Sequence, residues 1–371
     1  MSNYQNIKLE GSKEVTMQSS KPETRKNWLS IKASSYRFVK TAKGAEDFVD
    51  TVDQDKEAQH EPLFNNPFQL EDLSVFDDAT MREMLRSSMH GLGVKDLATG
   101  LQGAAPKLTE KVLRNLTYRQ RAQFLALQQA RPKRAAVKAA QKQILDSLFW
   151  ELTYWKTPEL YEELTEGENL HPGIFRSLKT TLSGKTVLDA GAGSGRACFE
   201  CLRDEAKQVF ALEPSPGLLH LLEQKLVNQP KPPRIIPLRG RFDNIPIENN
   251  SVDVALACSA FTAESAQGGE QGLSELQRVT RAGGKVVIIW PRPEDYDWLA
   301  AHGFNYVAMP LRQEMQVRFR SLEVARRCAQ RFYARNSRLL RYLHEQKQPT
   351  VPFSVLGFNP PHDYCWLEVK K

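Results

Sequence analysis

The chain has 371 residues, of which 41% are hydrophobic and 26% are charged, and its formal net charge is +7 at pH 7. This length exceeds what one ordinary domain needs, so we expect more than one. No apolar run approaches the roughly 20 residues of a membrane span, and five cysteines without an apolar leader favour a reducing compartment. Composition therefore argues against a membrane-embedded protein and a disulfide scaffold, and it predicts a cytoplasmic location.

Residues 1–61 are rich in Lys, Glu, Ser, Gln and Thr, and their apolar residues are scattered without a sustained period. Such a segment cannot bury enough apolar surface to offset the entropy lost on ordering. We predict a disordered N-terminal arm.

Residues 62–152 have the pattern of closely spaced short helices. Asp77 and Asp78 are suited to cap the first helix, and Thr117 to Gln120 has the form of a capping box. The expected apolar faces are Met81, Met84, Leu85 and Met89, then Val94, Leu97 and Leu101, then, after Pro106, Leu108, Val112, Leu113 and Leu116. A longer helix is expected over residues 135–149. Short helices with short connections stack as an α-solenoid fragment, which commonly binds another protein.

Three segments of this region, residues 68–78, 95–104 and 111–117, resemble in order the armadillo-like helical domain of the bacterial flagellar motor switch protein FliG. The resemblance implies a docking scaffold, with flagellar motor components among its candidate partners. In that family the next helix typically carries an acidic pair that works against the stator, whereas residues 124–129 contain no acid. The resemblance therefore favours a binding or assembly role over torque generation. A generic helical docking module is the alternative.

Residues 187–196 predict a buried strand, a glycine-rich turn and the start of a helix. Gly191, Gly193 and Gly195 recur at every second position, so the backbone can approach a ligand without Cβ atoms. A helix that begins after such a turn commonly binds a nucleotide-like ligand. A second acid, Glu213, ends the next apolar strand at 208–212, where ribose hydroxyls are usually accepted.

The spacing of this turn is Gly-x-Gly-x-Gly and not the Gly-x-Gly-x-x-Gly of dinucleotide-binding proteins, and later segments add to the pattern. They are residues 240–246, a strand at 251–259, and residues 278–290 as a helix end, a glycine turn and a strand. Together these motifs resemble the class I S-adenosylmethionine-dependent methyltransferases, over roughly residues 157–371. The resemblance implies an α/β, Rossmann-like domain at 153–371 with a mostly parallel seven-stranded sheet, and S-adenosylmethionine as cofactor.

The same resemblance implies a set of cofactor-binding residues. These are Asp189, Gly191, Ala192 and Gly193 around the methionine end, Glu213 on the ribose hydroxyls, and Phe242 and Asp243 beside the adenine, together with Gly195 and Pro214. Many relatives carry an acid directly after the glycine that Gly240 matches, and this chain has Arg241 there. Asp243 could instead be a turn-forming acid. No catalytic residue is predicted, because a sulfonium cofactor carries its own activation and a general base is optional.

Three further motifs favour structure over chemistry. Residues 359–362 look like the Asn-Pro-Pro-aromatic signature of amino methylation, but they do not follow the fourth strand, so we expect the turn of a hairpin between 352–358 and 364–369. Cys258 lacks the preceding proline of a cytosine-methylating nucleophile. Cys198 and Cys201 have metal-ligand spacing without a second pair, so we expect core packing and no metal site.

Two segments bear on partners and domain packing. Between positions 318 and 341 the arginines are Arg318, Arg320, Arg326, Arg327, Arg331, Arg335, Arg338 and Arg341, against the single acid Glu323. This stripe could track the phosphates of a nucleic acid or an acidic protein surface, although we favour ion pairing with acids elsewhere in the domain. In the aromatic segment 150–161, Trp155 or Tyr161 could cover the cofactor, as in related methyltransferases, or pack the two domains together, which we favour.

These patterns yield one main hypothesis and two alternatives. The main one is an S-adenosylmethionine-dependent methyltransferase whose acceptor is a protein recruited by residues 62–152. The acceptor could instead be a small molecule or an RNA. The chain could also be a non-catalytic interaction protein, although a pure scaffold has no physical need for the acid and glycine set.

Overall fold

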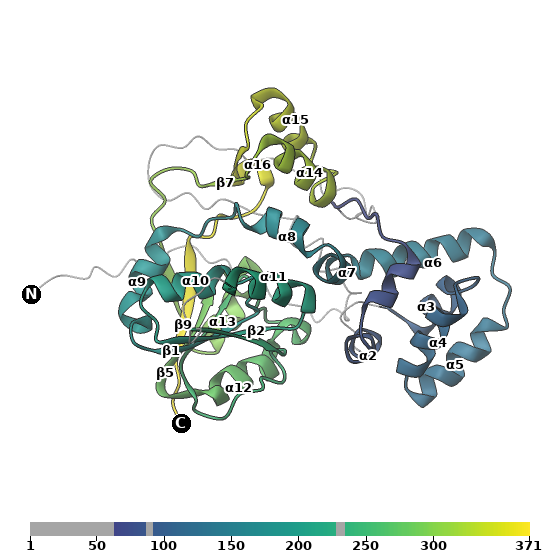
Figure 1. The fold of residues 1–371 in the computed structure, drawn as a ribbon, viewed down its shortest axis with the longest axis horizontal. Helices are drawn as coiled ribbons and strands as arrows, with labels where there is room; N and C mark the ends of the chain where they lie inside the picture. The colour runs from purple at the N-terminus through teal and green to yellow at the C-terminus, as the bar shows by residue number, and fades with distance from the viewer. Residues whose placement is uncertain (1–62, 87–91, 228–233) are drawn as a thin grey trace, which may run out of the picture.

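The computed structural model describes residues 63–86, 92–227 and 234–371. The predicted N-terminal arm and Met89 lie outside these residues. Figure 1 shows a group of helices on one side, α2 to α6, and a sheet flanked by helices on the other, with α14 to α16 above the sheet. Within the described ranges, no helix has both the length and the apolar character needed to cross a bilayer.

The helical module, as we name the segment from η1 to α6, follows the predicted helices closely. Its elements are η1 (Leu70–Val75), α2 (Asp78–Arg86), α3 (Val94–Gly100), α4 (Pro106–Asn115), α5 (Tyr118–Gln128) and α6 (Arg134–Ser147). The Asp77 carboxylate accepts the Thr80 amide at 2.8 Å, and the Thr117 hydroxyl accepts the Gln120 amide at 3.3 Å. Both predicted caps are confirmed.

The helix expected over residues 135–149 is confirmed, but it ends two residues earlier than expected. Helix α6 ends at Ser147, and α7 (Phe149–Lys156) begins a new direction after Leu148, whose ψ of 11° departs from the helical range. The break turns both Leu148 and Phe149 inward, where they are 3% and 0% exposed. Helix α8 (Pro158–Thr165) follows after Thr157.

The sheet has the predicted mostly parallel, seven-stranded form. Its strands are β1 (Thr186–Ala190), β2 (Gln208–Glu213), β3 (Ile235–Arg239), β4 (Val252–Cys258), β5 (Thr280–Ile289), β6 (Asn305–Ala308) and β9 (Asp363–Glu368). Their order is β3-β2-β1-β4-β5-β9-β6, and β9 is antiparallel to both of its neighbours. The order reverses between β1 and β4, which is where doubly wound sheets bind ligands.

Helices cover both faces of this sheet (Figure 1). They are α9 (Pro172–Leu182), α10 (Arg196–Arg203), α11 (Pro216–Leu226), α12 (Gly269–Val279) and α13 (Tyr296–Ala301). Consecutive residues of β1 enter different layers, because side chains alternate along a strand: Val187 packs in the core that includes Cys198 of α10, and Leu188 in the core that includes Leu276 of α12. Cys198 and Cys201 are buried free thiols.

The predicted hairpin between residues 352–358 and 364–369 is wrong. Strand β8 (Thr350–Pro352) pairs with β7 (Gln316–Arg318), and a short helix, α16 (Phe353–Leu356), follows it. Strand β9 pairs instead with β5 and β6, because its buried residues complete the main sheet. The Asn359-Pro360-Pro361 segment connects α16 to that sheet.

A third core joins the helical module to the cap, which we define as α14 (Leu322–Phe332), α15 (Ser337–Gln346) and α16. Phe149 lies at its centre, stacked on Phe64 with ring centroids 3.8 Å apart and edge-on to Phe332 of the cap at 6.1 Å. Val112 of α4 and Leu339 of α15 belong to the same continuous cluster. The helical module and the cap are therefore one packed unit.

Candidate functional site

A cavity of about 500 Å³ opens at the carboxyl ends of β1, β2, β4 and β5. It is lined by Asp189, Gly191, Ala192, Gly193, Glu213, Pro214, Phe242 and Asp243, which is every predicted cofactor-binding residue except Gly195. Its size falls within the range of about 300–1,000 Å³ that is usual for small-molecule sites. The structure thus gathers the predicted residues from three separate segments, 189–193, 213–214 and 242–243, around one space.

Each glycine of the turn is needed for a different local reason. Gly191 has φ +75°, and a Cβ there would lie 2.4 Å from the Cβ of Ala260. Gly193 has φ +55° and no atom within 4 Å of the Cβ position, so its backbone faces open space. At Gly195, φ is +98° and a Cβ would meet Leu222 at 2.6 Å. Gly195 therefore allows α10 to pack closely, outside the cavity wall.

Asp189 presents an unused acceptor to the cavity. The Cys198 thiol donates to its Oδ2 at 3.0 Å, while the buried Oδ1 has no hydrogen-bond partner among the described residues. Burial raises the pKa of Asp189 to about 6, although the Cys198 hydrogen bond and Arg196 oppose the shift. An acceptor buried without a partner is costly, so this atom points to a ligand that donates.

Glu213 fixes the adjoining corner. Its Oε2 accepts the Gly193 amide at 2.9 Å and its Oε1 accepts the Ser215 amide at 2.9 Å. Burial raises the pKa of Glu213 to about 7 despite these two amides. A carboxylate has about four acceptor sites, so each oxygen keeps capacity for a further donor such as a hydroxyl.

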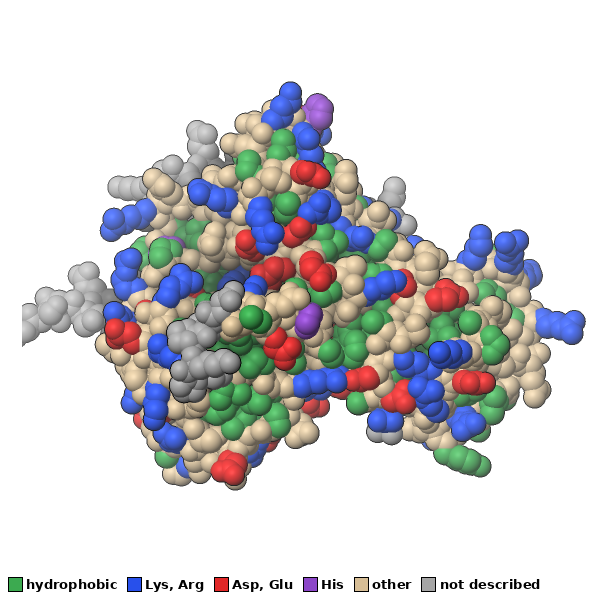
Figure 2. Space-filling model, viewed as in Figure 1, with side chains coloured by type: hydrophobic (Ala, Val, Ile, Leu, Met, Phe, Trp, Pro, Cys, Tyr) green, Lys and Arg blue, Asp and Glu red, His purple; other side chains and the backbone are tan. Residues whose placement is uncertain are grey.

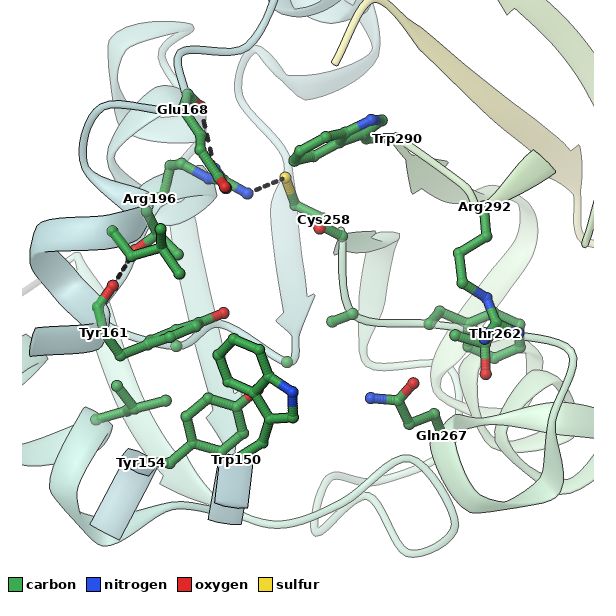
Figure 3. Close-up of a pocket in the computed structure, with 18 of the residues that line it drawn as sticks. Trp150, Tyr154, Tyr161, Glu168, Arg196, Cys258, Thr262, Gln267, Trp290 and Arg292 are labelled. Carbon is green, nitrogen blue, oxygen red and sulfur yellow. Dashed lines mark hydrogen bonds and ion pairs between the residues drawn. The ribbon is translucent and has the colours of Figure 1, made fainter. Parts of the chain in front are cut away.

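Helices α7 and α8 form an aromatic wall opposite β4 and β5 (Figure 3). Trp150, Tyr154 and Tyr161 line the cavity, and the Tyr154 and Tyr161 ring centroids are 4.7 Å apart. The indole N–H of Trp150 is buried and has no acceptor among the described residues. Glu151 also lines the cavity, and burial raises its pKa to about 7.

The two aromatic residues singled out from the sequence have separate places. Trp155 packs edge-on against Phe76 of the helical module, with ring centroids 5.5 Å apart, and the Arg239 guanidinium lies 5.5 Å from its ring. Trp155 therefore joins the two regions. Tyr161 instead lines the cavity.

The far end of the cavity combines a thiol, a partly buried ion pair and strained backbone. Arg196 at the start of α10 lies 3.6 Å from the Glu168 carboxylate and 3.7 Å from the Cys258 sulfur. Burial raises the pKa of Cys258, although Arg196 opposes the shift, so Cys258 is a thiol at neutral pH. Ser259 and Trp290, directly after β4 and β5, have φ values of +57° and +55°. Such backbone strain in non-glycine residues concentrates at functional sites.

Arg241, the departure from the pattern of related enzymes, has a partner in the helical module. Its guanidinium pairs with Glu83 of α2, and its Nε lies 3.4 Å from the Asp243 carboxylate. An acid from another part of the chain thus lies beside residue 241.

The arginine stripe divides between α14 and α15 and the residues before them. Arg320 pairs with Glu166 at 2.7 Å and Arg327 pairs with Glu163 at 2.5 Å, as the ion-pairing interpretation expects. Arg338 lines the cavity. Nucleic-acid binding by the remaining arginines stays a prediction.

Comparisons with known proteins agree with this geometry. Residues 188–288 match the family model described as methyltransferase domain, and residues 50–148 match the one described as FliG C-terminal domain. An uncharacterized methyltransferase of Mycobacterium tuberculosis is 30% identical over 122 residues, which are 33% of this chain and 46% of that protein. The tRNA(Thr) (cytosine(32)-N(3))-methyltransferase of Saccharomyces cerevisiae is 22% identical over 148 residues, or 38% of this chain and 24% of that protein.

The chain carries an S-adenosylmethionine-dependent methyltransferase domain. Among solved structures, the YcgJ protein of Bacillus subtilis aligns with a TM-score of 0.39 at 10% identity, over 54% of this chain and 99% of that one. This chain covers less than half of the length of the Mycobacterium relative. The FliG resemblance of the helical module is likewise supported by its family match.

The residues of the methyltransferase domain fit S-adenosylmethionine. The cofactor offers an ammonium group and ribose hydroxyls, which are donors, and the site presents the unpartnered Oδ1 of Asp189 and the carboxylate of Glu213. The open backbone at Gly193 leaves room for a ligand to approach closely. Asp189, Gly193 and Glu213 would hold the methionine and ribose parts.

Sequence reasoning missed most of the cavity wall. Trp150, Glu151, Arg196 and Trp290 line the cavity of the methyltransferase domain, as does the cap through Phe332. The dense aromatic segment around Trp150 was the only local signal, and it was equally consistent with domain packing. The remaining residues converge only through the tertiary fold.

Proposed function

We propose that this protein catalyses methyl transfer from S-adenosylmethionine in the cavity of the methyltransferase domain. The observation that carries the proposal is the convergence of the glycine turn, Asp189 and Glu213 on one cavity, with a buried carboxylate oxygen left without a partner. When bound, S-adenosylmethionine supplies a methyl group that is already activated by its sulfonium.

The protein's own residues then bind, orient and exclude water. Glu213 accepts the ribose hydroxyls, Asp189 accepts from the ammonium group, and Phe242 and Asp243 border the adenine. The aromatic wall keeps water out and holds the acceptor beside the methyl group, which is the main requirement of this chemistry. A general base is not required.

Calorimetric titration with S-adenosylmethionine, and separately with S-adenosylhomocysteine, tests the cofactor site. Glu213→Ala removes hydroxyl contacts worth on the order of 1–3 kcal/mol, so it should weaken binding by about 5- to 150-fold. Glu368→Ala is the matched control, because Glu368 is an exposed acid, also at a strand end, outside the cavity. Equal affinity of both variants and the wild type would overturn the ribose assignment.

We further propose that the acceptor is a protein recruited by the helical module in the cytoplasm. Residues 117–145 contain no acid and carry Arg119, Arg121, Arg131, Lys133, Arg134, Lys138 and Lys142, all exposed. Figure 2 shows Lys and Arg side chains along the outer edge of the helical region. Such an edge favours a partner with an acidic surface, and the FliG resemblance makes flagellar motor proteins the first candidates to test.

A small-molecule acceptor is the second candidate, favoured by the aromatic lining of the cavity. Labelled methyl groups from S-adenosylmethionine should enter the protein fraction of a cell extract under the first proposal, and the low-molecular-mass fraction under the second. Label in RNA would favour an RNA acceptor. Cofactor binding without transfer to any fraction would favour the non-catalytic interaction protein.

A further inference from the structure

The loop after β3 connects the cofactor cavity to the helical module. We define the cofactor loop as residues 239–243; its Phe242 and Asp243 line the cavity. Arg239 ends β3 in register with Glu213, and the Gly240 amide donates to the Glu213 carbonyl at 3.4 Å. A shift of this loop therefore moves both the adenine side and the ribose side of the cavity.

Helix α2 holds the first residue of the cofactor loop. The Arg239 guanidinium lies 2.5 Å from the Asp77 carboxylate and donates to the Thr80 hydroxyl at 3.2 Å. The same guanidinium lies over the Trp155 ring. These three partners hold the Arg239 guanidinium, so it is more restricted than it would be in a single surface ion pair.

The next turn of α2 holds the middle of the loop. Glu83 pairs with Arg241, and Arg241 in turn lies against Asp243 at the cavity. The Arg241 and Glu83 side chains are only 33% and 30% exposed, so solvent screens their attraction less than at an open surface. Asp77, the residue before α2, and Glu83 within α2 thus contact the first and the middle residue of the cofactor loop.

Helix α7 supplies a second connection to the same corner. The Tyr154 carbonyl accepts the Ser215 hydroxyl at 3.0 Å, and Ser215 also donates its amide to Glu213. Trp155, one residue later, packs on Phe76 directly before α2. The corner that holds Glu213 is therefore fixed to the helical module through both the cofactor loop and α7.

We infer that Asp77 and Glu83 of the helical module are positioning residues for the cofactor, acting through Arg239 and Arg241 on the cofactor loop. This inference rests on the proposed function. In this arrangement Arg241 anchors the loop to Glu83. By linkage, a partner that displaces α2 changes cofactor affinity by the same factor by which cofactor changes partner affinity.

The neighbouring acids Asp77 and Asp78 provide a matched test in the full-length protein. Asp77 pairs across to Arg239, whereas Asp78 pairs bidentately with Arg114 inside the helical module. Asp77→Asn keeps the helix cap, because Asn caps as well as Asp, and Glu83→Gln keeps the side-chain shape. The double variant D77N/E83Q is compared with D78N and with the wild type.

We expect the D77N/E83Q variant to bind S-adenosylhomocysteine about fivefold or more weakly, and D78N to bind it like the wild type. The KM for S-adenosylmethionine should rise by the same factor, with kcat at saturating cofactor unchanged. Loss of folded protein would instead lower kcat and leave KM alone, and melting curves of all three proteins check for it.

Amide hydrogen exchange supplies the reciprocal measurement. Cofactor binding should slow exchange in α2 of the wild type and of D78N, and this protection should be lost in D77N/E83Q. If the wild type binds cofactor and D77N/E83Q keeps the same affinity and the same protection of α2, the inference is overturned and the proposed function stands. Absence of cofactor binding by the folded wild type overturns the proposed function, and the inference with it.

Discussion

Three glycines, Gly184, Gly191 and Gly193, allow the cavity geometry to be tested by one substitution type, because all three have a positive φ but only Gly191 among them has a protein atom within 4 Å of its Cβ position. Gly184 has φ +71°, no neighbour within 4 Å of the Cβ position, and a place outside the cavity. Gly184→Ala should therefore cost only the left-handed backbone penalty, about 1–2 kcal/mol. It sets the baseline for the other two.

Gly191→Ala adds a steric term to that baseline. Its Cβ would lie 2.4 Å from the Ala260 Cβ, which is far inside van der Waals contact. Forcing this much overlap into a packed site costs typically about 1–3 kcal/mol more, for a total of roughly 2–5 kcal/mol. The free energy of unfolding, measured by urea titration without cofactor, checks the value.

Gly193→Ala should separate stability from binding. Its Cβ meets no protein atom within 4 Å, so the stability loss should equal that of Gly184→Ala. Gly193 lines the cavity, however, so the added methyl should weaken S-adenosylhomocysteine binding by about tenfold or more. Equal unfolding energies for Gly184→Ala and Gly191→Ala would refute the steric reasoning. Wild-type affinity of Gly193→Ala would remove the turn from the cofactor site.

Three further predictions follow from the buried groups. Trp150→Phe keeps the ring stacked on Phe332 but removes the unpartnered N–H. It should therefore raise the unfolding free energy of the ligand-free protein by about 1 kcal/mol and weaken cofactor or acceptor binding. A loss of stability in this variant would contradict the prediction. Burial raises the pKa of Glu213 to about 7 in the folded protein, against 4.5 in the unfolded chain, so the folded state binds more protons between these pH values. The free energy of unfolding should therefore fall as the pH rises from about 4.5 to 7, by on the order of 3 kcal/mol for this group. Affinity for the positively charged cofactor should rise over pH 6 to 8, which calorimetry at several pH values measures; a flat profile would contradict the assignment. Phe149→Ala should cost about 3–5 kcal/mol and lower the stability of the helical module and the cap together, which hydrogen exchange resolves.

The local part of the site could be predicted from the sequence because short-range chemistry determines it. Glycine periodicity identified the turn at 191–195, and an acid at the end of an apolar strand identified Glu213. The caps at Asp77 and Thr117 were equally readable, since a cap needs only residues three positions apart. These features require no knowledge of distant parts of the chain.

The remainder depends on contacts between distant residues. Proline and asparagine at 359–361 correctly indicated a connection, but strand pairing is non-local, and β9 pairs with β5 and β6 in place of the adjacent segment. Trp150 and Trp290 are far apart in the chain, and only the fold brings them to the same cavity. Arg241 could be recognised as unusual from the sequence, but its partner Glu83 lies in another region of the chain. The ion pair between them could therefore be seen only in the structure.

The core shared with the cap makes the helical module part of one packed unit with the cavity wall, and not a separate docking domain. A docking module on a linker would bury its apolar residues within itself, and a bound partner would then be distant from the chemistry. Here Phe149 packs against Phe332 of the cap, and both the cap and α7 line the cofactor cavity. A partner on the helical module therefore acts on residues that are packed continuously with the cavity wall, as well as through Arg239 and Arg241. A fragment that ended near residue 152 would lack Phe332 and expose the Phe149 core, so partner capture has to be measured on the whole chain, with cofactor concentration as the variable.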